Sequence, residues 1–387
     1  MRNTMIIACL WVIGLAPCLQ AETAPAKKPA PSAPAKAALP KTHADAAARS
    51  LAFLARVQKP DGRWETLSNE PPSLEAYHGK MTMVLTSASG LAMLAHGDDE
   101  TSGTYRKQIA KAKDYLLGLI SKDGKFTLPK YADGLIKTHI ANEVPFMVFF
   151  LNEIYSRSKD AELKTALQKV ADYISAGQHP RGGWDYTYKN TRHRHTATAI
   201  QNLAALALLK RSGIRVKDKT INDALAFIKD RHPKPTEKPG YMYYGDGAKK
   251  TPLEPGVTNR AAGLLVAMHL LDKKNDPLRS AALTYHKAAM SHKYIYGGHS
   301  PAYQHFMVAT ASNQLGRKSW STYIRTFGRT HLNTQNTDGQ WPTTFGASDR
   351  AHPHGGIVFE TAVTAMILQL PLENLTFAKG DSQPTPL

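Results

Sequence analysis

Side chains that bind anions or transfer protons gather at the starts of six largely apolar stretches. They are His78, His139, Glu143, His193, His195, Asn259, Arg260, Tyr303, His305, His354 and Glu360. Imidazoles exchange protons near neutral pH, arginine offers a fork for carboxylate or phosphate, and carboxyl groups act as acids or bases. Whether these groups form one site depends on the elements that carry them.

Two kinds of helical pattern alternate along the chain. One kind is amphipathic: apolar residues from Tyr105 to Leu119, and again from Leu163 to Ile174, recur with helical spacing between charged residues. The other kind is apolar or small almost all round, so such a helix must be buried. These stretches are 85–94, 144–151, 196–209 and 258–271. Alternation of the two kinds predicts an outer ring of amphipathic helices around an inner ring of buried ones.

A short turn sequence ends several of the amphipathic patterns. Gln58–Trp64, Ser121–Phe126, Gln178–Trp184 and Asn336–Trp341 each place glycine shortly before an aromatic residue. The first three copies recur about every 60 residues, enough for two helices and two loops. Glycine permits a tight turn, and the aromatic residue is expected to pack between outer helices.

The predicted fold is therefore all-α, an α/α toroid of about six helix pairs. Its inner helices should begin near Thr82, Asn142, Thr196, Thr258, Tyr303 and Glu360, with Pro145 and Pro255 acting as helix breakers or caps. Because inner helices of such a toroid run parallel, their starts should converge on one opening. We call this opening, formed by the first turns of the inner helices, the mouth.

The turns at 58–64, 178–184 and 338–341 resemble the repeats of squalene-hopene cyclases and protein prenyltransferase β subunits. The resemblance covers residues 44 to about 372 and implies the toroid, but not the chemistry. The cyclases' Asp-x-Asp-Asp motif is missing, and the nearest acidic cluster is Asp98-Asp99-Glu100. The cysteine that prenyltransferases use for zinc is missing after residue 18, as is the Gly-Cys-Gly-Glu-Gln string of thioester toroids.

The N-terminal residues have the pattern of an export signal. A basic start, a short apolar run and Ala21 predict a signal peptide over 1–21. An Ala/Pro/Lys-rich linker follows over 22–43, then the toroid over 44–376 and a flexible tail over 377–387. Both cysteines, Cys9 and Cys18, lie in the predicted signal. The protein is expected in the periplasm or outside the cell, with no stable membrane span.

The chain carries a formal charge of +18, and residues 1–43 supply only five basic groups and one acidic group. The predicted toroid is therefore strongly basic and favours an acidic polysaccharide or an acidic envelope protein as partner. Export argues against nucleic acid. No cofactor and no metal are expected, because the His193/His195 and His352/His354 pairs have no third ligand at a defined spacing.

The mouth should attract anions. Helix N-termini carry partial positive charge and free N–H groups, and Arg260 adds a fixed cation. Tyrosines near the predicted turns offer flat faces for sugars: Tyr186, Tyr188, Tyr243, Tyr244 and Tyr303. Glu143 and Glu360 could instead cap helix N-termini.

Three functions fit these features. The first is a toroid without catalysis that binds an anionic glycan or an envelope protein through His78, His139, Glu143, His193, Asn259, His305, His354 and Glu360. The alternative is a polysaccharide lyase or hydrolase, with His195 as base, Tyr303 as acid and Arg260 as carboxylate clamp. Terpenoid cyclisation or prenyl transfer, the activity of the resembling families, ranks last because their motifs are absent.

Overall fold

The computed structural model describes residues 43–67, 81–121, 140–188, 194–231, 259–290, 301–342 and 356–380. Every α-helix in these residues belongs to one of two sets. The inner set comprises α3 (Thr82–Ala95), α5 (Ile140–Ser158), α7 (Thr196–Arg211), α9 (Asn259–Leu270), α11 (Pro301–Gln314) and α13 (Gly356–Gln369). These helices begin within four residues of the predicted positions. All residues of α3 are buried, as expected of a helix without a polar face.

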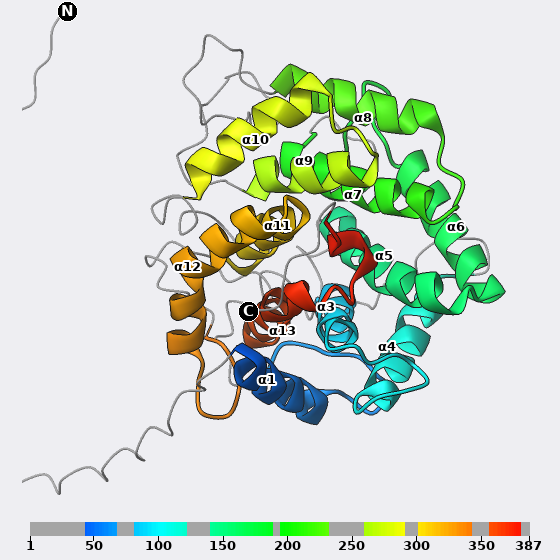
Figure 1. Cartoon of the computed structure of the whole chain (residues 1–387). Coiled ribbons are helices and arrows are strands. Elements are labelled where there is room, and N and C mark those ends of the chain that lie inside the picture. The colour runs from blue at the N-terminus through cyan, green and yellow to red at the C-terminus, as the bar shows by residue number, and fades with distance from the viewer. Residues whose placement is uncertain are drawn as a thin grey trace, which may run out of the picture. The chain divides into compact units, whose positions relative to one another are not determined.

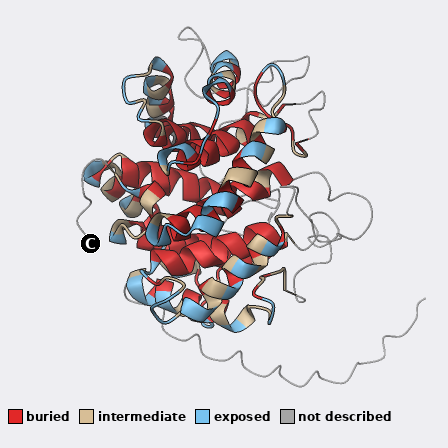
Figure 2. Ribbon diagram, turned by 90° about the vertical axis from the view of Figure 1, so that its right-hand side faces the viewer, coloured by how far each residue is buried: buried red, intermediate tan, exposed pale blue. Residues whose placement is uncertain are grey.

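The outer set alternates with the inner set along the chain. It comprises α1 (His43–Val57), α4 (Arg106–Gly118), α6 (Ala161–Ala176), α8 (Asp218–Arg231), α10 (Pro277–Ala289) and α12 (Arg317–Thr334). Each outer helix buries one stripe: in α6, Leu163, Leu167, Val170 and Ile174 are buried, as the sequence pattern predicts. Figure 2 shows buried residues filling the inner helices and exposed residues marking the outer ones.

The inner helices form a closed ring. Each packs on the next in chain order, and α13 returns to pack on α3, so neighbours in space follow neighbours in sequence until the ring closes (Figure 1). Closure buries the last apolar faces that an open arc would leave in water. The prediction of an all-α α/α toroid is confirmed.

The aromatic residue of each described glycine turn is a packing element. Trp64, Trp184 and Trp341 are completely buried, and each indole N–H donates to the carbonyl ten residues earlier, at 2.7–2.8 Å. The backbone N–H groups of Trp64 and Trp341 donate to threonines on α3 and α13, respectively. The turn thereby ties the end of an outer helix to the following inner helix.

The glutamine of each turn reaches forward to the next outer helix. Gln58 donates to the carbonyl of Gln108 on α4 at 3.0 Å, and Gln178 to that of Thr220 on α8 at 2.8 Å. Gln335, at the end of α12, donates to the carbonyl of Ala46 on α1 at 2.8 Å. The same contact that joins successive repeats therefore joins the last repeat to the first.

All described residues belong to one compact unit, residues 38–387. Its packed part extends beyond residue 376, because a short 3₁₀ helix, η4 (Thr376–Ala378), buries Phe377. The proposed signal peptide and nearly all of the proposed linker lie outside the described residues. Among the residues that are described, no helix has both the length and the apolar character needed to cross a bilayer.

The glycine turns provide a direct test of this architecture. Gly182 has φ +76°, and a Cβ there would lie 2.0 Å from the Asp223 carbonyl oxygen on α8, whereas Gly213 has φ +84° and open space around it. Both Gly→Ala substitutions incur left-handed strain of about 1–2 kcal/mol. Only Gly182→Ala adds a backbone clash, so urea unfolding should show it to be less stable than Gly213→Ala by about 2 kcal/mol or more. Equal losses would contradict the packing.

Candidate functional site at the mouth

The described residues place five predicted site residues within the first five residues of inner helices or directly before them. They are Glu143, His195, Arg260, Tyr303 and Glu360. Asn259 begins α9, although its side chain is not among those described. His78, His139, His193, His352, His354, Tyr243 and Tyr244 lie outside the described residues, so their predicted roles stay predictions.

Glu143 is a buried carboxyl that reaches from α5 to the start of α3. Its Oε2 accepts the backbone N–H of Val84 at 3.4 Å, and α3 has no side-chain cap of its own. Burial raises the pKa of Glu143 to about 7, and the Val84 N–H opposes that rise only in part. Near neutral pH, Glu143 can therefore exist as acid or as carboxylate.

Glu360 holds the corresponding position between α13 and α11. It is completely buried, and neither carboxyl oxygen makes a hydrogen bond of standard geometry within the described part of the chain. Burial raises its pKa well above the ordinary value, and the backbone N–H of Ala302 only partly offsets this. Burial therefore favours the protonated, uncharged form of Glu360.

The two carboxyl-bearing turns meet at one level of the ring. α5 and α13 are the inner helices that pack on either side of α3. One turn after Glu143, Phe146 contacts Phe359, the residue before Glu360, edge to face at 5.6 Å between ring centroids. The structure thus places two buried glutamates with raised pKa values on the two inner helices that neighbour α3.

His195 and Tyr186 form a stacked pair just before α7. Their rings lie 3.9 Å apart at an interplanar angle of 13°, and both are half-buried. Backbone hydrogen bonds fix both residues: the Ala141 N–H donates to the Tyr186 carbonyl, and the His195 N–H donates to that of Trp184. The pair therefore has a defined orientation at the start of α5 and α7.

Tyr303 and Arg260 are both buried rather than exposed at the surface of the mouth. Tyr303 is buried, its hydroxyl is hydrogen-bonded with Gln201 of α7, and burial raises its pKa. Arg260 is only 4% exposed in the first turn of α9. Gln201 was not predicted as a site residue, although a polar pair inside the otherwise apolar stretch 196–209 is a visible signal.

An unusual contact fixes α5 behind Glu143. Pro145 lies inside α5 rather than at its start, and it has no N–H to donate to the Ala141 carbonyl. Asn202 of α7 donates to that carbonyl instead, at 2.9 Å, and accepts a hydrogen bond from the Tyr188 hydroxyl. Tyr188 is thus a buried structural residue, not the sugar-facing surface predicted for it.

His305 is not brought to the other predicted groups. Its Nδ1 lies 3.2 Å from the Tyr323 hydroxyl, which also contacts Nε2 of His331 at 2.9 Å, so the three side chains form a buried cluster between α11 and α12. Tyr303 and His305 are two residues apart and therefore project about 200° apart around α11. Tyr303 contacts Phe146 within the ring, which leaves His305 on the opposite face.

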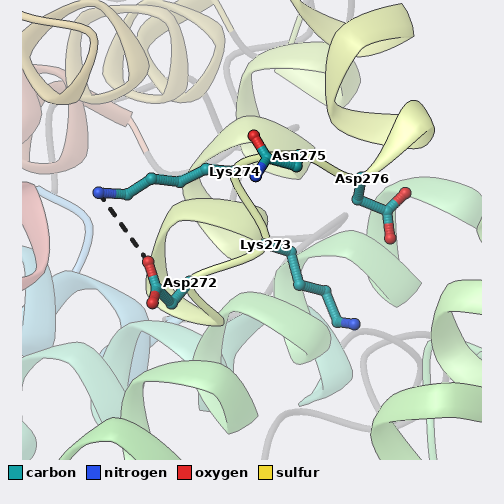
Figure 3. A pocket seen from close by; sticks show the side chains of 5 residues that line it. All are labelled: Asp272, Lys273, Lys274, Asn275 and Asp276. Atoms are coloured by element: carbon teal, nitrogen blue, oxygen red, sulfur yellow. Dashed lines mark ion pairs between the residues drawn. The ribbon is translucent and has the colours of Figure 1, made fainter.

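Two other acidic or charged features lie away from the mouth. Asp98 and Asp99, the only adjacent aspartates in the described residues, follow the C-terminal end of α3 and bind backbone and hydroxyl groups of their own loop. A surface hollow at the turn between α9 and α10 is lined by residues 272–276, with Asp272 and Lys274 3.9 Å apart (Figure 3). Asp276 there caps α10. Both features therefore have a structural role at the end or the start of a helix.

No group of three or more histidine, cysteine or acidic side chains suited to holding a metal occurs in the described parts of the chain. His193, His352 and His354 lie outside those parts, so the expectation that the two His-x-His pairs bind no metal stays a prediction.

The buried histidines predict a pH-dependent stability. Burial lowers the pKa of His331 to about 3 and that of His286 to about 4, whereas both should titrate near 6.5 when unfolded. The unfolded chain therefore binds more protons below pH 6.5, and stability falls as pH falls. His331→Gln should remove about 2 kcal/mol of the loss between pH 7 and 5, measured by urea unfolding, whereas Thr330→Ala should leave it intact. An unchanged pH dependence in His331→Gln would contradict a neutral buried His331.

Three solved structures with a similar fold are glycoside hydrolases. The α-1,6-mannanase GH76A of Salegentibacter sp. HEL1_6 superposes with a TM-score of 0.58 at 10% identity, over 84% of this chain and 98% of that one. A family 76 glycoside hydrolase from a bovine Bacteroides thetaiotaomicron strain gives 0.59 at 16% identity, over 85% and 77%. An unsaturated glucuronyl hydrolase specific for heparin gives 0.54 at 14% identity, over 84% and 95%. At these identities the likeness concerns the fold.

Sequence comparison gives a family without an assigned activity. No curated protein sequence matches the chain. A family profile described as "Domain of unknown function (DUF6288)" matches residues 72–376, which include all six inner helices. This match is not to the squalene-cyclase or prenyltransferase repeats that the turn sequences resemble. The chain belongs to the DUF6288 family.

Proposed function

We propose that this protein is a glycoside hydrolase that acts on an acidic glycan at the mouth of the toroid. The observation that carries the proposal is the pair Glu143 and Glu360, two buried carboxyls with raised pKa values on the inner helices that flank α3. The shared fold with glycoside hydrolases over most of the chain supports the same reaction class.

The surroundings of each carboxyl give the proposed roles: a backbone N–H donates to Glu143, whereas neither oxygen of Glu360 has a hydrogen bond of standard geometry in the described part of the chain. Glu360 keeps its proton and donates it to the leaving glycosidic oxygen as the bond to the anomeric carbon breaks. Glu143, ionised above about pH 7, accepts a proton from the water whose oxygen forms the new bond to that carbon. The proton given by Glu360 and the proton gained by Glu143 balance the addition of one water molecule.

The preference for an acidic glycan rests on charge. Arg260 at the start of α9 suits a sugar carboxylate, and the converging N-termini add positive potential. The stacked Tyr186 and His195 offer a flat face for a sugar ring beside α7. The basic composition of the chain favours the same ligand class, and the predicted export signal would deliver the protein to compartments where such glycans occur.

Two alternative functions, a lyase and a glycan-binding toroid without catalysis, would give different results in the same experiment. A lyase would use His195 to abstract a proton and Tyr303 to return one, leaving an unsaturated product. A binding toroid without catalysis would leave the glycan intact. Isoprenoid cyclisation is not proposed, because Phe146, Phe306 and Tyr303 pack against one another inside the described ring, where a large apolar substrate would need space.

Replacing each glutamate by its neutral isostere tests the proposal. Glu143→Gln and Glu360→Gln should each lower the release of reducing ends from uronic-acid or sulfated oligosaccharides by about 10²–10⁴-fold, because each removes a proton-transfer group. Glu162→Gln, on the exposed first turn of α6, is the matched control and should retain full activity. Activity of the unmodified protein should rise with pH through about 7, as Glu143 ionises.

Full activity in both mouth variants would exclude this carboxyl pair. Unsaturated products that persist in both would instead favour the lyase reading, and binding without any product would favour the toroid that only binds.

A further inference from the structure

The chain after α13 folds back across the end of the ring opposite the mouth. It turns through a short 3₁₀ helix, η3 (Leu370–Leu372), and then forms η4, which contacts α5 and α11. Figure 1 shows this segment, in red, lying among the inner helices. We call residues 373–378 the C-terminal clasp.

A buried carboxylate on α5 holds the clasp. Glu153 is completely buried and accepts three hydrogen bonds: from the Thr376 backbone N–H at 2.9 Å, the Thr376 hydroxyl at 2.7 Å and the Phe377 N–H at 3.0 Å. Burial raises the pKa of Glu153, and the hydrogen bonds from Thr376 and Phe377 oppose that rise. The clasp is therefore anchored to α5 at a defined position.

The opposite side of the clasp is bound by α11. Asn313 donates to the Ala378 carbonyl at 2.9 Å, and Gln314 donates to the Phe377 carbonyl at 2.6 Å. Asn313 and Gln314 are the last two residues of α11 and are buried, so the clasp joins the C-terminal halves of α5 and α11 across the ring.

Phe377 inserts from the clasp into the axis of the ring. It is 1% exposed, and its ring contacts Phe149 of α5 at 4.8 Å and Phe306 of α11 at 6.1 Å between centroids. Aromatic pairs at these separations contribute about 0.5–1.5 kcal/mol beyond the burial of their area. Phe377 is thus the lowest member of an aromatic stack.

The stack continues upward to the mouth. Phe306 contacts Phe146 at 5.8 Å, and Phe146 in turn contacts Tyr303 at 6.0 Å and Phe359 at 5.6 Å. Phe359 precedes Glu360, and Tyr303 lies in the first turn of α11. These six rings, which we call the axial aromatic column, connect the clasp to the floor of the proposed site: Phe377, Phe149, Phe306, Phe146, Tyr303 and Phe359.

We propose that Phe377 is a positioning residue for the mouth, acting through the axial aromatic column. Loss of the Phe377 ring would leave a cavity below Phe149 and Phe306, and in a close-packed interior their relaxation into that cavity would shift the rings above them. The clasp thereby sets the position of Tyr303 and Phe359 along the axis of the ring. Because Glu360 follows Phe359 directly, the clasp also sets the position of Glu360. The consequence for turnover rests on the proposed function, whereas the coupling itself does not.

The experiment is hydrogen–deuterium exchange of the full chain, compared among Phe377→Ala, Phe377→Leu and Leu372→Ala. Leu372 lies directly before the clasp but is 50% exposed, so its variant is the matched control. Phe377→Ala should speed exchange at least tenfold in the first turns of α5, α11 and α13. Phe377→Leu should restore most of the protection, and Leu372→Ala should match the unmodified protein. Faster exchange confined to the clasp and the C-terminal halves of α5 and α11 would overturn the proposal.

A second variant covers the case in which Phe377→Ala fails to fold. Glu153→Gln keeps every ring of the column but weakens the anchor of the clasp, so it should give the same pattern of faster exchange with smaller amplitude. Faster exchange of the clasp in Glu153→Gln without any change at the mouth would also overturn the coupling.

Turnover separates this inference from the proposed function. If the protein hydrolyses a glycan, Phe377→Ala should lower kcat more than it raises KM, because misplacement of Glu360 acts on the transition state. If no glycan is hydrolysed, the proposed function fails while the exchange result still decides the coupling.

Discussion

The structure depends on one constraint: its inner helices have no polar face and must be buried on every side. An open arc of such helices would leave two apolar flanks in water, so α13 packs on α3 and the ring closes. The turn contacts serve the same end, because Gln335 reaches from α12 to Ala46 on α1, 289 residues away, as Gln58 reaches from α1 to α4. Closure places each inner helix between two others, and Glu143 of α5 reaches the first turn of α3 in this way.

The closed ring also determines how the carboxyls behave. A glutamate in the first turns of an inner helix faces the neighbouring helix rather than solvent, so desolvation dominates its pKa. The Val84 N–H opposes the rise at Glu143 and the Ala302 N–H opposes it at Glu360, but burial outweighs the backbone donor at both residues. Two residues that occupy similar places in the repeat thus have raised pKa values for the same physical reason.

The ring of helices and its repeat length can be predicted from the sequence, because the inner helices that begin at Thr82 and Thr196 are recognisable by their apolar composition. The sequence predicts a residue's surroundings less well where these are formed by residues distant in the chain. Pro145 resembles a helix start, but α5 accommodates it because Asn202 satisfies the Ala141 carbonyl from another helix. His305 was grouped with Tyr303, although their separation of two residues on one helix already directs them to opposite faces. Phe377 was assigned to a flexible tail because nothing local reveals its aromatic partners on α5 and α11.

The central claim is that the mouth is a site for acidic glycans. The most direct measurement is amide hydrogen exchange of the unmodified full chain with an acidic oligosaccharide, and with a neutral one of equal length as the control. The account predicts protection in the first turns of α5, α7, α9, α11 and α13 with the acidic ligand alone. Protection confined to the outer helices, such as the face of α12 that exposes Lys318, Arg325 and Arg329, would contradict it, as would equal protection by the neutral ligand.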